Sequence, residues 1–313
     1  MPAPRPVALA FAVLLAASAT GCRHPQDGTV ESAVEVQGRE RSFLYRLPPG
    51  HTTVGRTWPL VVYLHGQMGT GMQLERSSGA SDAADRHGFV VVYPDGVDRS
   101  WNDRRGATKA SDQGVDDVAF VRALIDRFVA EHGVDPDRVY VAGMSNGGMM
   151  SFRLACELGD RIAAFSPVGA LMPVNGAEAC RPARPVPMLL VVGTDDPLVP
   201  YGGGTVARDR GEVLSAEATR AHWVSVDGCS AAEDNRTLDA HDDDTRVLES
   251  RRSACLAGSE VVLLSVEGGG HTWPGARGEL PELLVGKTST EIDATEEQLR
   301  FFEAHPRRPA TPR

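Results

Sequence analysis

Short apolar runs alternate with amphipathic stretches along most of this chain. Several runs, such as residues 89–93, are apolar throughout, which is typical of strands buried on both faces of a sheet. Strands of this kind separated by helical patterns favour a mostly parallel sheet covered by helices on both faces. The predicted strands are 42–47, 60–64, 89–93, 138–142, 163–168, 188–192 and 261–266.

The clearest helical pattern covers residues 116–132, where Val121, Leu124 and Phe128 recur on one side. Further helices are predicted over 77–87, 146–158, 216–226 and 295–305. The polar segment 100–113 is predicted to be a surface loop, and no internal repeat is visible. The pattern therefore predicts an α/β domain.

The first residues have the features of an export signal. A positive residue, Arg5, precedes an apolar run over 7–17 that is too short to span a membrane as a helix. Small residues then lead to Ala19-Thr20-Gly21-Cys22, which resembles a bacterial lipobox in which Cys22 is lipidated. We expect an extracytoplasmic protein, either anchored to the membrane only through lipid on Cys22 or, if the signal is cleaved in the ordinary way, secreted.

Composition predicts that the chain consists of one folded domain with short segments before and after it. Residues 1–22 are the predicted signal peptide, 23–35 a flexible linker, 36–305 a single folded domain and 306–313 a disordered tail rich in Pro and Arg. The length of 313 residues, 42% of them apolar, is sufficient for one large core. We expect a monomer.

The net charge of −10 argues against a nucleic-acid partner, because the chain has no basic stripe to face phosphates. A small neutral or apolar substrate fits better. The acidic run at 241–244 is interpreted as a solvated loop, and neither a metal nor a cofactor is predicted.

The segment Gly143-Met144-Ser145-Asn146-Gly147 fits the pattern G-x-S-x-G. In that pattern a strand turns sharply into a helix and presents the serine hydroxyl above the sheet edge. The turn is too tight for bulk two residues before and two after the serine, which explains both glycines. A predicted strand before it and an apolar helix after it supply the required setting. Ser145 is therefore predicted to be the nucleophile of an α/β-hydrolase fold, the alternative being a glycine-rich turn with an incidental serine.

A serine nucleophile needs a base and an acid, which follow it in this fold in the order acid, then histidine. Asp195 and Asp196 follow the strand predicted over 188–192, and spacing does not separate them. His271 follows the last predicted strand and three glycines, which let the backbone approach the serine. The other downstream histidines, in a helix, an acidic loop and a chain end, are less suitable: His222, His241 and His305. His271 is predicted to be the general base.

The tetrahedral intermediate of acyl transfer needs N–H donors for its oxyanion. The amide of Asn146, directly after the nucleophile, is one predicted donor. The second is placed on Gln67, in the turn after the strand 60–64. His65 is interpreted as a structural residue of that turn.

Four cysteines follow Cys22, an even number in a chain predicted to enter an oxidising compartment. Three pairings are possible, and order along the chain favours Cys156 with Cys180 and Cys229 with Cys255. Four buried free thiols are the alternative.

Several segments together resemble the polyhydroxybutyrate (PHB) depolymerase and feruloyl esterase family of extracellular α/β-hydrolases, over about residues 36–305. These segments are Leu64-His65-Gly66, Gly143 to Gly148, Gly193 to Tyr201 and Gly269 to Gly275. The resemblance implies a carboxylic ester hydrolase whose acid is Asp196, and it implies the same two cysteine pairs. It also matches Ser100-Trp101-Asn102 and Val115-Asp116-Asp117 to family segments, whereas 103–113 departs from the pattern of many relatives.

The substrate is predicted to be a small-molecule or oligomeric ester: a short-chain, hydroxycinnamoyl or hydroxyalkanoate ester. Trp101 and Trp273 are predicted to be aromatic walls of its site, the alternative being ordinary half-buried aromatics. A PHB depolymerase acting on polymer, or a surface lipoprotein that only binds ligand, are the alternative functions.

Overall fold

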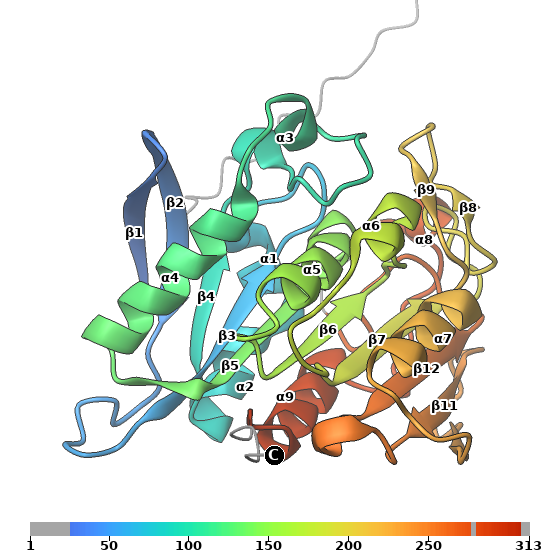
Figure 1. Cartoon of the computed structure of the whole chain (residues 1–313). Helices are drawn as coiled ribbons and strands as arrows, with labels where there is room; N and C mark the ends of the chain where they lie inside the picture. The colour runs from blue at the N-terminus through green and yellow to red at the C-terminus, as the bar shows by residue number, and fades with distance from the viewer. Residues whose placement is uncertain (1–25, 277–279, 308–313) are drawn as a thin grey trace, which may run out of the picture.

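A computed structural model describes residues 26–276 and 280–307 of the chain (Figure 1). The predicted signal peptide, Cys22 and residues 308–313 of the predicted tail lie outside the described residues. The tail prediction was wrong at its start, because Arg307 is bound to the domain. Its backbone N–H donates to the carbonyl of Asp137 at 2.7 Å and its guanidinium to the carboxylate of Asp137 at 2.9 Å.

One sheet dominates the described residues, and its ten strands follow the order β1-β2-β4-β3-β5-β6-β7-β12-β11-β10. The strands are β1 (Thr29–Val36), β2 (Arg39–Arg46), β3 (Trp58–Leu64), β4 (Val90–Pro94), β5 (Val134–Met144), β6 (Ala164–Val168), β7 (Met188–Gly193), β10 (Asp234–Leu238), β11 (Arg246–Arg252) and β12 (Val261–Glu267). The six strands from β4 to β12 in this order run parallel, and an antiparallel pair flanks them on each side. The predicted fold class is confirmed.

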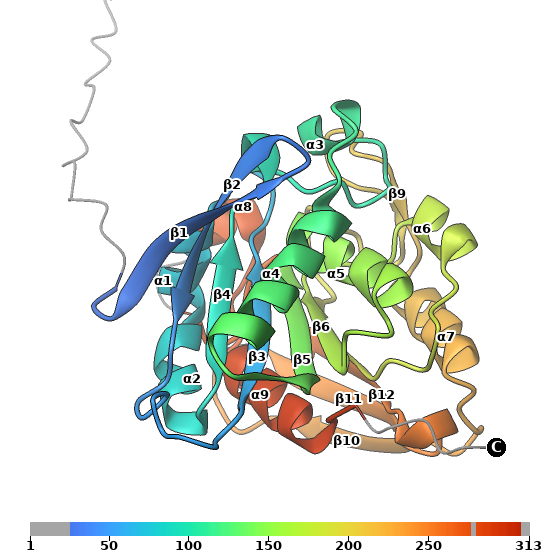
Figure 2. The same cartoon turned by 60° about the vertical axis from the view of Figure 1, so that its left-hand side comes forward.

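Helices cover both faces of the sheet (Figures 1 and 2). One face carries α4 (Asp117–Glu131), α5 (Asn146–Glu157) and α7 (Ala216–Val226), and the other carries α1 (Gly71–Ser78), α2 (Ala80–His87) and α9 (Ala294–Ala304). The helix predicted over 77–87 is divided in the structure. Gly79, with φ of 66°, ends α1 and begins α2, because a left-handed residue stops the helical ladder.

Shorter elements complete the described part of the chain. They are α3 (Lys109–Asp112), α6 (Val174–Ala179), α8 (Glu282–Val285), the hairpin strands β8 (Gly204–Thr205) and β9 (Glu212–Val213), and 3₁₀ turns at Val97–Arg99 and Leu256–Gly258. Within residues 26–276 and 280–307, no helix is long and apolar enough to cross a membrane.

The linker predicted over 23–35 was wrong from Thr29 onward, because Thr29–Val36 forms β1 and pairs along its whole length with β2. This outermost strand has mixed polarity and lacks the apolar run that marks the central strands. Its hydrogen-bonded partner, rather than its own composition, makes it a strand.

The surface loop predicted over 100–113 was also wrong. The segment contains α3, and the side chains of Trp101, Asp103 and Arg105 are buried. The polar composition of the segment had suggested exposure to solvent. Charged side chains can nevertheless be buried where they are paired, and Asp103 and Arg105 form an ion pair at 2.7 Å.

Both predicted disulfides are present: Cys156 with Cys180 and Cys229 with Cys255. The first joins the C-terminal end of α5 to the connection between β6 and β7. The second joins the end of α7 to the segment before β12. Two disulfides are compatible with an extracytoplasmic protein.

Candidate active site

Ser145 stands at the turn between β5 and α5 with φ of 54° and ψ of −119°. Such backbone is strained for a residue with a side chain and persists only where the surroundings hold it. The Ser145 amide donates to the carbonyl of Val168 at 2.9 Å. A Cβ on Gly147 would lie 2.2 Å from the carbonyl oxygen of Leu64, and one on Gly143 would lie 2.5 Å from the backbone of Gly147. The two glycines are therefore required by contact as well as by the turn.

The structure separates the two aspartates that spacing left open. Asp196 is buried, and its Oδ1 accepts from the amides of Leu198 at 2.7 Å and Val199 at 2.8 Å. This leaves Oδ2 facing Nδ1 of His271 at 2.7 Å. Asp195 is more exposed, and its carboxylate accepts from the hydroxyl of Thr194. Asp196, the residue that the family resemblance implies, is thus the one in contact with the histidine.

His271 is held by close contacts of the glycines before it. Its amide donates to the carbonyl of Val285, and the amide of Gly270 donates to that of Lys287 at 2.9 Å. A Cβ on Gly270 would lie 2.1 Å from the carbonyl oxygen of Val285. The C-terminal end of α8 and the residues after it therefore set the position of the histidine, and only glycine fits at residue 270.

The imidazole of His271 and the backbone of Ser145 both lie close to the C-terminal end of β6. A Cβ on Gly169 would lie 3.4 Å from Nδ1 of His271, and the preceding Val168 accepts from the Ser145 amide. A carboxylate only accepts hydrogen bonds, so with Asp196 ionised Nδ1 of His271 carries the proton. Nε2 then has a lone pair with which to take a proton from an alcohol.

The turn that carries Gln67 passes next to the nucleophile. A Cβ on Gly66 would lie 3.4 Å from Cβ of Ser145. The next two backbone amides after Gln67 already have partners. That of Met68 donates to the carbonyl of Arg99 at 2.8 Å, and that of Gly69 donates to the carbonyl of Gly66 at 2.9 Å. The two predicted oxyanion donors, on Gln67 and Asn146, thus belong to segments next to Ser145. Their role stays a prediction.

His65 holds this turn in place. Its Nε2 accepts from the amide of Gly96 at 3.0 Å, so Nδ1 carries the proton and donates to the carbonyl of Gly66 at 2.8 Å. Burial lowers the pKa of His65, which favours the neutral ring that these two bonds require.

The prediction that Trp101 and Trp273 form aromatic walls was wrong. Their exposed fractions are 0% and 2%, so neither offers a face to a ligand. The indole of Trp101 donates to the carbonyl of His65 at 2.8 Å, and that of Trp273 donates to the hydroxyl of Thr295 at 3.0 Å. Aromatic residues near a site in sequence can point into the core, and here each indole N–H has a partner there.

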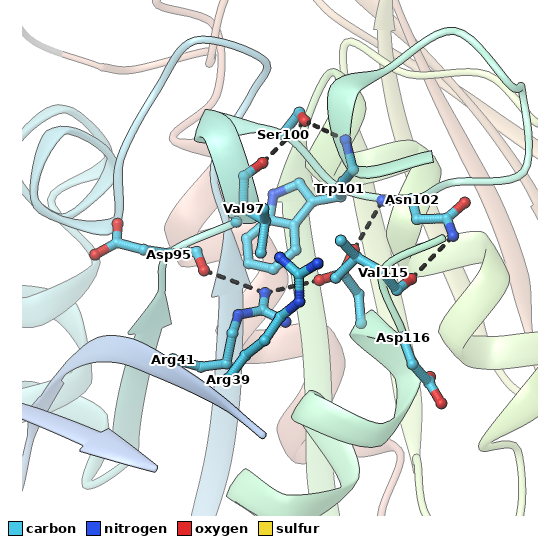
Figure 3. A network of polar contacts seen from close by, with 12 residues as sticks. Arg39, Arg41, Asp95, Val97, Ser100, Trp101, Asn102, Val115 and Asp116 are labelled. Atoms are coloured by element: carbon cyan, nitrogen blue, oxygen red, sulfur yellow. Dashed lines mark hydrogen bonds and ion pairs between the residues drawn. The ribbon is translucent and has the colours of Figure 1, made fainter. Parts of the chain in front are cut away.

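A buried polar network that the sequence did not reveal supports the segment after β4 (Figure 3). Arg41 forms an ion pair with Asp117 at 2.7 Å, and the other oxygen of Asp117 accepts from the amide of Asn102 at 2.8 Å. The side chain of Asn102 donates to the carbonyl of Val115 at 2.9 Å. Burial raises the pKa of Asp117, and the guanidinium of Arg41 opposes that rise. The resemblance marked Asn102 and Asp117, but no spacing rule connects either to Arg41.

Comparison with known proteins fixes the family of this chain. The family model described as esterase PHB depolymerase matches residues 41–181. The protein named "Putative esterase NocK" from Nocardia uniformis subsp. tsuyamanensis is 31% identical over 312 residues, covering 96% of this chain and 90% of that protein. The chain belongs to the PHB depolymerase esterase family. The activity that follows is hydrolysis of carboxylic esters.

Other relatives of this PHB depolymerase-type esterase carry related names. Feruloyl esterase B of Piromyces equi is 33% identical over 241 residues, which are 74% of this chain but 42% of that protein, so the chain spans less than half of it. An acetyl xylan esterase structure from Aspergillus awamori superposes with a TM-score of 0.58, covering 88% of this chain and 99% of that one. At 15% identity the latter likeness shows the fold alone.

Proposed function

We propose that this esterase works through an acyl-enzyme formed on Ser145, with His271 as the general base and Asp196 as its acid partner. The observation that carries the proposal is the buried contact of 2.7 Å between Asp196 and His271, next to the strained turn of Ser145. A protein that only bound ligand would gain nothing from a strained serine beside a carboxylate-bound imidazole.

The chemistry proceeds in two halves. Nε2 of His271 takes the hydroxyl proton of Ser145 while Oγ bonds to the ester carbonyl carbon, and the carbonyl oxygen becomes an oxyanion facing the amides of Gln67 and Asn146. His271 then gives its proton to the alkoxy oxygen as the ester C–O bond breaks. Water repeats these steps on the acyl-serine, which releases the carboxylic acid and restores the serine.

The proposed substrates are soluble short-chain, hydroxycinnamoyl or hydroxyalkanoate esters. The names of the relatives, esterase and feruloyl esterase among them, support this class. The proposed location is outside the cytoplasm, which the two disulfides support, with a lipid anchor on Cys22 as the further proposal. Attack on a PHB polymer is the second substrate proposal, supported by the family description.

Labelling with a fluorophosphonate tests the nucleophile. We expect one covalent label per molecule, lost in Ser145→Ala and retained in the control Ser77→Ala. Ser145→Ala and His271→Ala should each lower kcat by about 10⁴-fold or more, because these groups act as a unit. A folded Ser145→Ala protein that still took up the label would refute the assignment.

A panel of esters tests the substrate class. We expect p-nitrophenyl esters of short acids to be cleaved with the highest kcat/KM, compared with methyl ferulate and a hydroxybutyrate oligomer. A preference for acyl chains of about eight or more carbons would contradict this expectation, since each methylene in a matching pocket adds about 1–3 kcal/mol.

A further inference from the structure

The side chain of Asn146 is buried directly behind the nucleophile and is committed to three hydrogen bonds. Its Oδ1 accepts from the amide of Trp101 at 2.8 Å, and its Nδ2 donates to the carbonyl of Trp101 at 3.1 Å. Nδ2 also donates to Oδ2 of Asp103 at 2.6 Å, a short bond to a charged acceptor. Both amide protons are therefore used, and the orientation of the side chain is fixed.

Asp103 is a buried charge, and its side chain is fully covered. Arg105 neutralises it: Nε lies 2.9 Å and Nη2 2.7 Å from Oδ2, and the Arg105 amide donates to Oδ1 at 3.0 Å. The remaining arm of Arg105 donates to the carbonyl of Arg210 at 2.9 Å, in the connection between β8 and β9. The pair thus joins the segment after β4 to that connection.

Stability alone is a weak reason for such a pair. Removing two charges from water costs several kcal/mol per ion, and apolar residues of similar volume often serve as well or better. The bond from Asp103 to Asn146 instead places the pair next to a peptide that the reaction uses. The amide of Asn146 has to point at the oxyanion, and a displacement of about 1 Å in such a donor costs about 10²-fold in rate.

We propose that Asp103 is a positioning residue for the oxyanion hole: it anchors the side chain of Asn146 and thereby aims the Asn146 amide at the reacting carbonyl oxygen. Arg105 has a second effect in this arrangement. It cancels a buried negative charge that would otherwise oppose the developing oxyanion. This inference rests on the proposed function, since it acts on the intermediate formed at Ser145.

The test compares Asp103→Ala with Asp103→Asn, whose amide oxygen can still accept from Asn146. Asp85→Ala is the matched control, because Asp85, on α2, forms a partly buried ion pair with Arg46 on β2. The readouts are kcat and KM on p-nitrophenyl acetate, and the Kd of a boronic acid that forms a tetrahedral adduct with the nucleophile. All variants are compared by thermal unfolding.

We expect Asp103→Ala to lower kcat about 10-fold to 100-fold, less than the full loss of a donor, and to weaken boronic-acid binding by a similar factor. KM should stay within about threefold, because the bond acts in the transition state. Asp103→Asn should recover part of the kcat. Asp85→Ala should lose stability while its kcat stays within about threefold.

A folded Asp103→Ala enzyme with unchanged kcat, or with unchanged boronic-acid affinity, would overturn the proposal. If that variant does not fold, Asn146→Ala breaks the same bond, together with the two bonds to Trp101, and leaves the Asp103–Arg105 pair intact. It should lower kcat by at least as much, and full activity would again overturn the proposal. Wild-type protein that takes up no fluorophosphonate would refute the proposed function itself. That result differs from the failure of the present inference, in which the wild type is active and the Asp103 variant has the same activity.

Discussion

The two sides of the site are held in different ways. On the nucleophile side, the segments after β3 and β4 are fixed by buried side chains: Asp117 binds the amide of Asn102, and Asn146 binds both backbone groups of Trp101. On the acid–base side, the segments after β7 and β12 are fixed by backbone contacts. The backbone amide of Thr194 donates to the carbonyl of Val266, and the backbone amide of Asp195 donates to the carbonyl of Gly269, each at 2.9 Å.

This difference determines how each side responds to mutation. A network of side chains can lose one hydrogen bond and retain the others, so a mutation there lowers stability or activity only in part. Backbone segments in direct contact leave no space for a methyl group: a Cβ on Gly193 would lie 2.2 Å from the carbonyl oxygen of Gly269. An added Cβ is therefore excluded at these contacts, as it is at Gly147 in the turn of Ser145, whereas only the nucleophile side adds a side-chain network with a graded response.

The largest effect is expected from the acid. Asp196→Asn removes the charge that faces Nδ1 of His271 and should lower kcat about 10³-fold to 10⁴-fold, because the imidazole is then held in the wrong tautomer. Asp195→Asn, one residue away, should change kcat by less than about threefold. Steady-state kinetics on one ester measures both, and a larger loss in Asp195→Asn would move the acid by one residue.

A methyl group at a backbone contact should have the next largest effect. Gly270→Ala places a Cβ 2.1 Å from the carbonyl oxygen of Val285 and should lower the free energy of unfolding by about 1–3 kcal/mol or more. It should also reduce kcat, because His271 is the next residue. Gly202→Ala is the matched control, since its Cβ would meet no heavy atom within 4 Å and its φ is not positive. Equal urea unfolding curves for the two variants would show that the backbone contact at residue 270 does not exclude a methyl group.

The third prediction concerns a buried carboxylate and is small at any one pH step. Asp103 and Asp117 are paired with arginines, whereas Asp227, which follows α7, accepts from the hydroxyl of Ser259 at 2.5 Å and the amide of Val186 at 3.1 Å. Burial raises the pKa of Asp227 from 3.8 to about 7. Between these values the folded chain keeps a proton that the unfolded chain releases, so stability falls as pH rises, by up to about 1.4 kcal/mol per pH unit.

Asp227→Asn should remove that part of the pH dependence. The difference in unfolding free energy between wild type and variant, measured in urea from about pH 4 to pH 7, should shift steadily toward the variant. If the unfolding free energies of wild type and variant instead changed in parallel with pH, Asp227 would be ionised throughout the range in the folded chain.

Local patterns were sufficient for the central strands and for placing Ser145, the pair Asp195 and Asp196, and His271 each after a strand whose apolar run is visible in sequence. The choice of Asp196 came from the family resemblance. They failed where a contact that the local pattern does not show decides the outcome. β1 depends on its pairing with β2, and the burial of Asp103 depends on its ion pair with Arg105. The burial of Trp101 depends on the carbonyl of His65, which no periodicity shows. The pairing of Arg41 with Asp117, 76 residues apart, has no local signal.

The order of the sheet leaves β1 and β10 as its two edges. Open edges offer unpaired amides and carbonyls to other chains and invite aggregation, which charged side chains discourage. Glu31 and Glu35 are exposed on β1, and Asp234 and Arg236 are exposed on β10. An incoming strand would have to bury these charges, so both edges are protected against the addition of another copy.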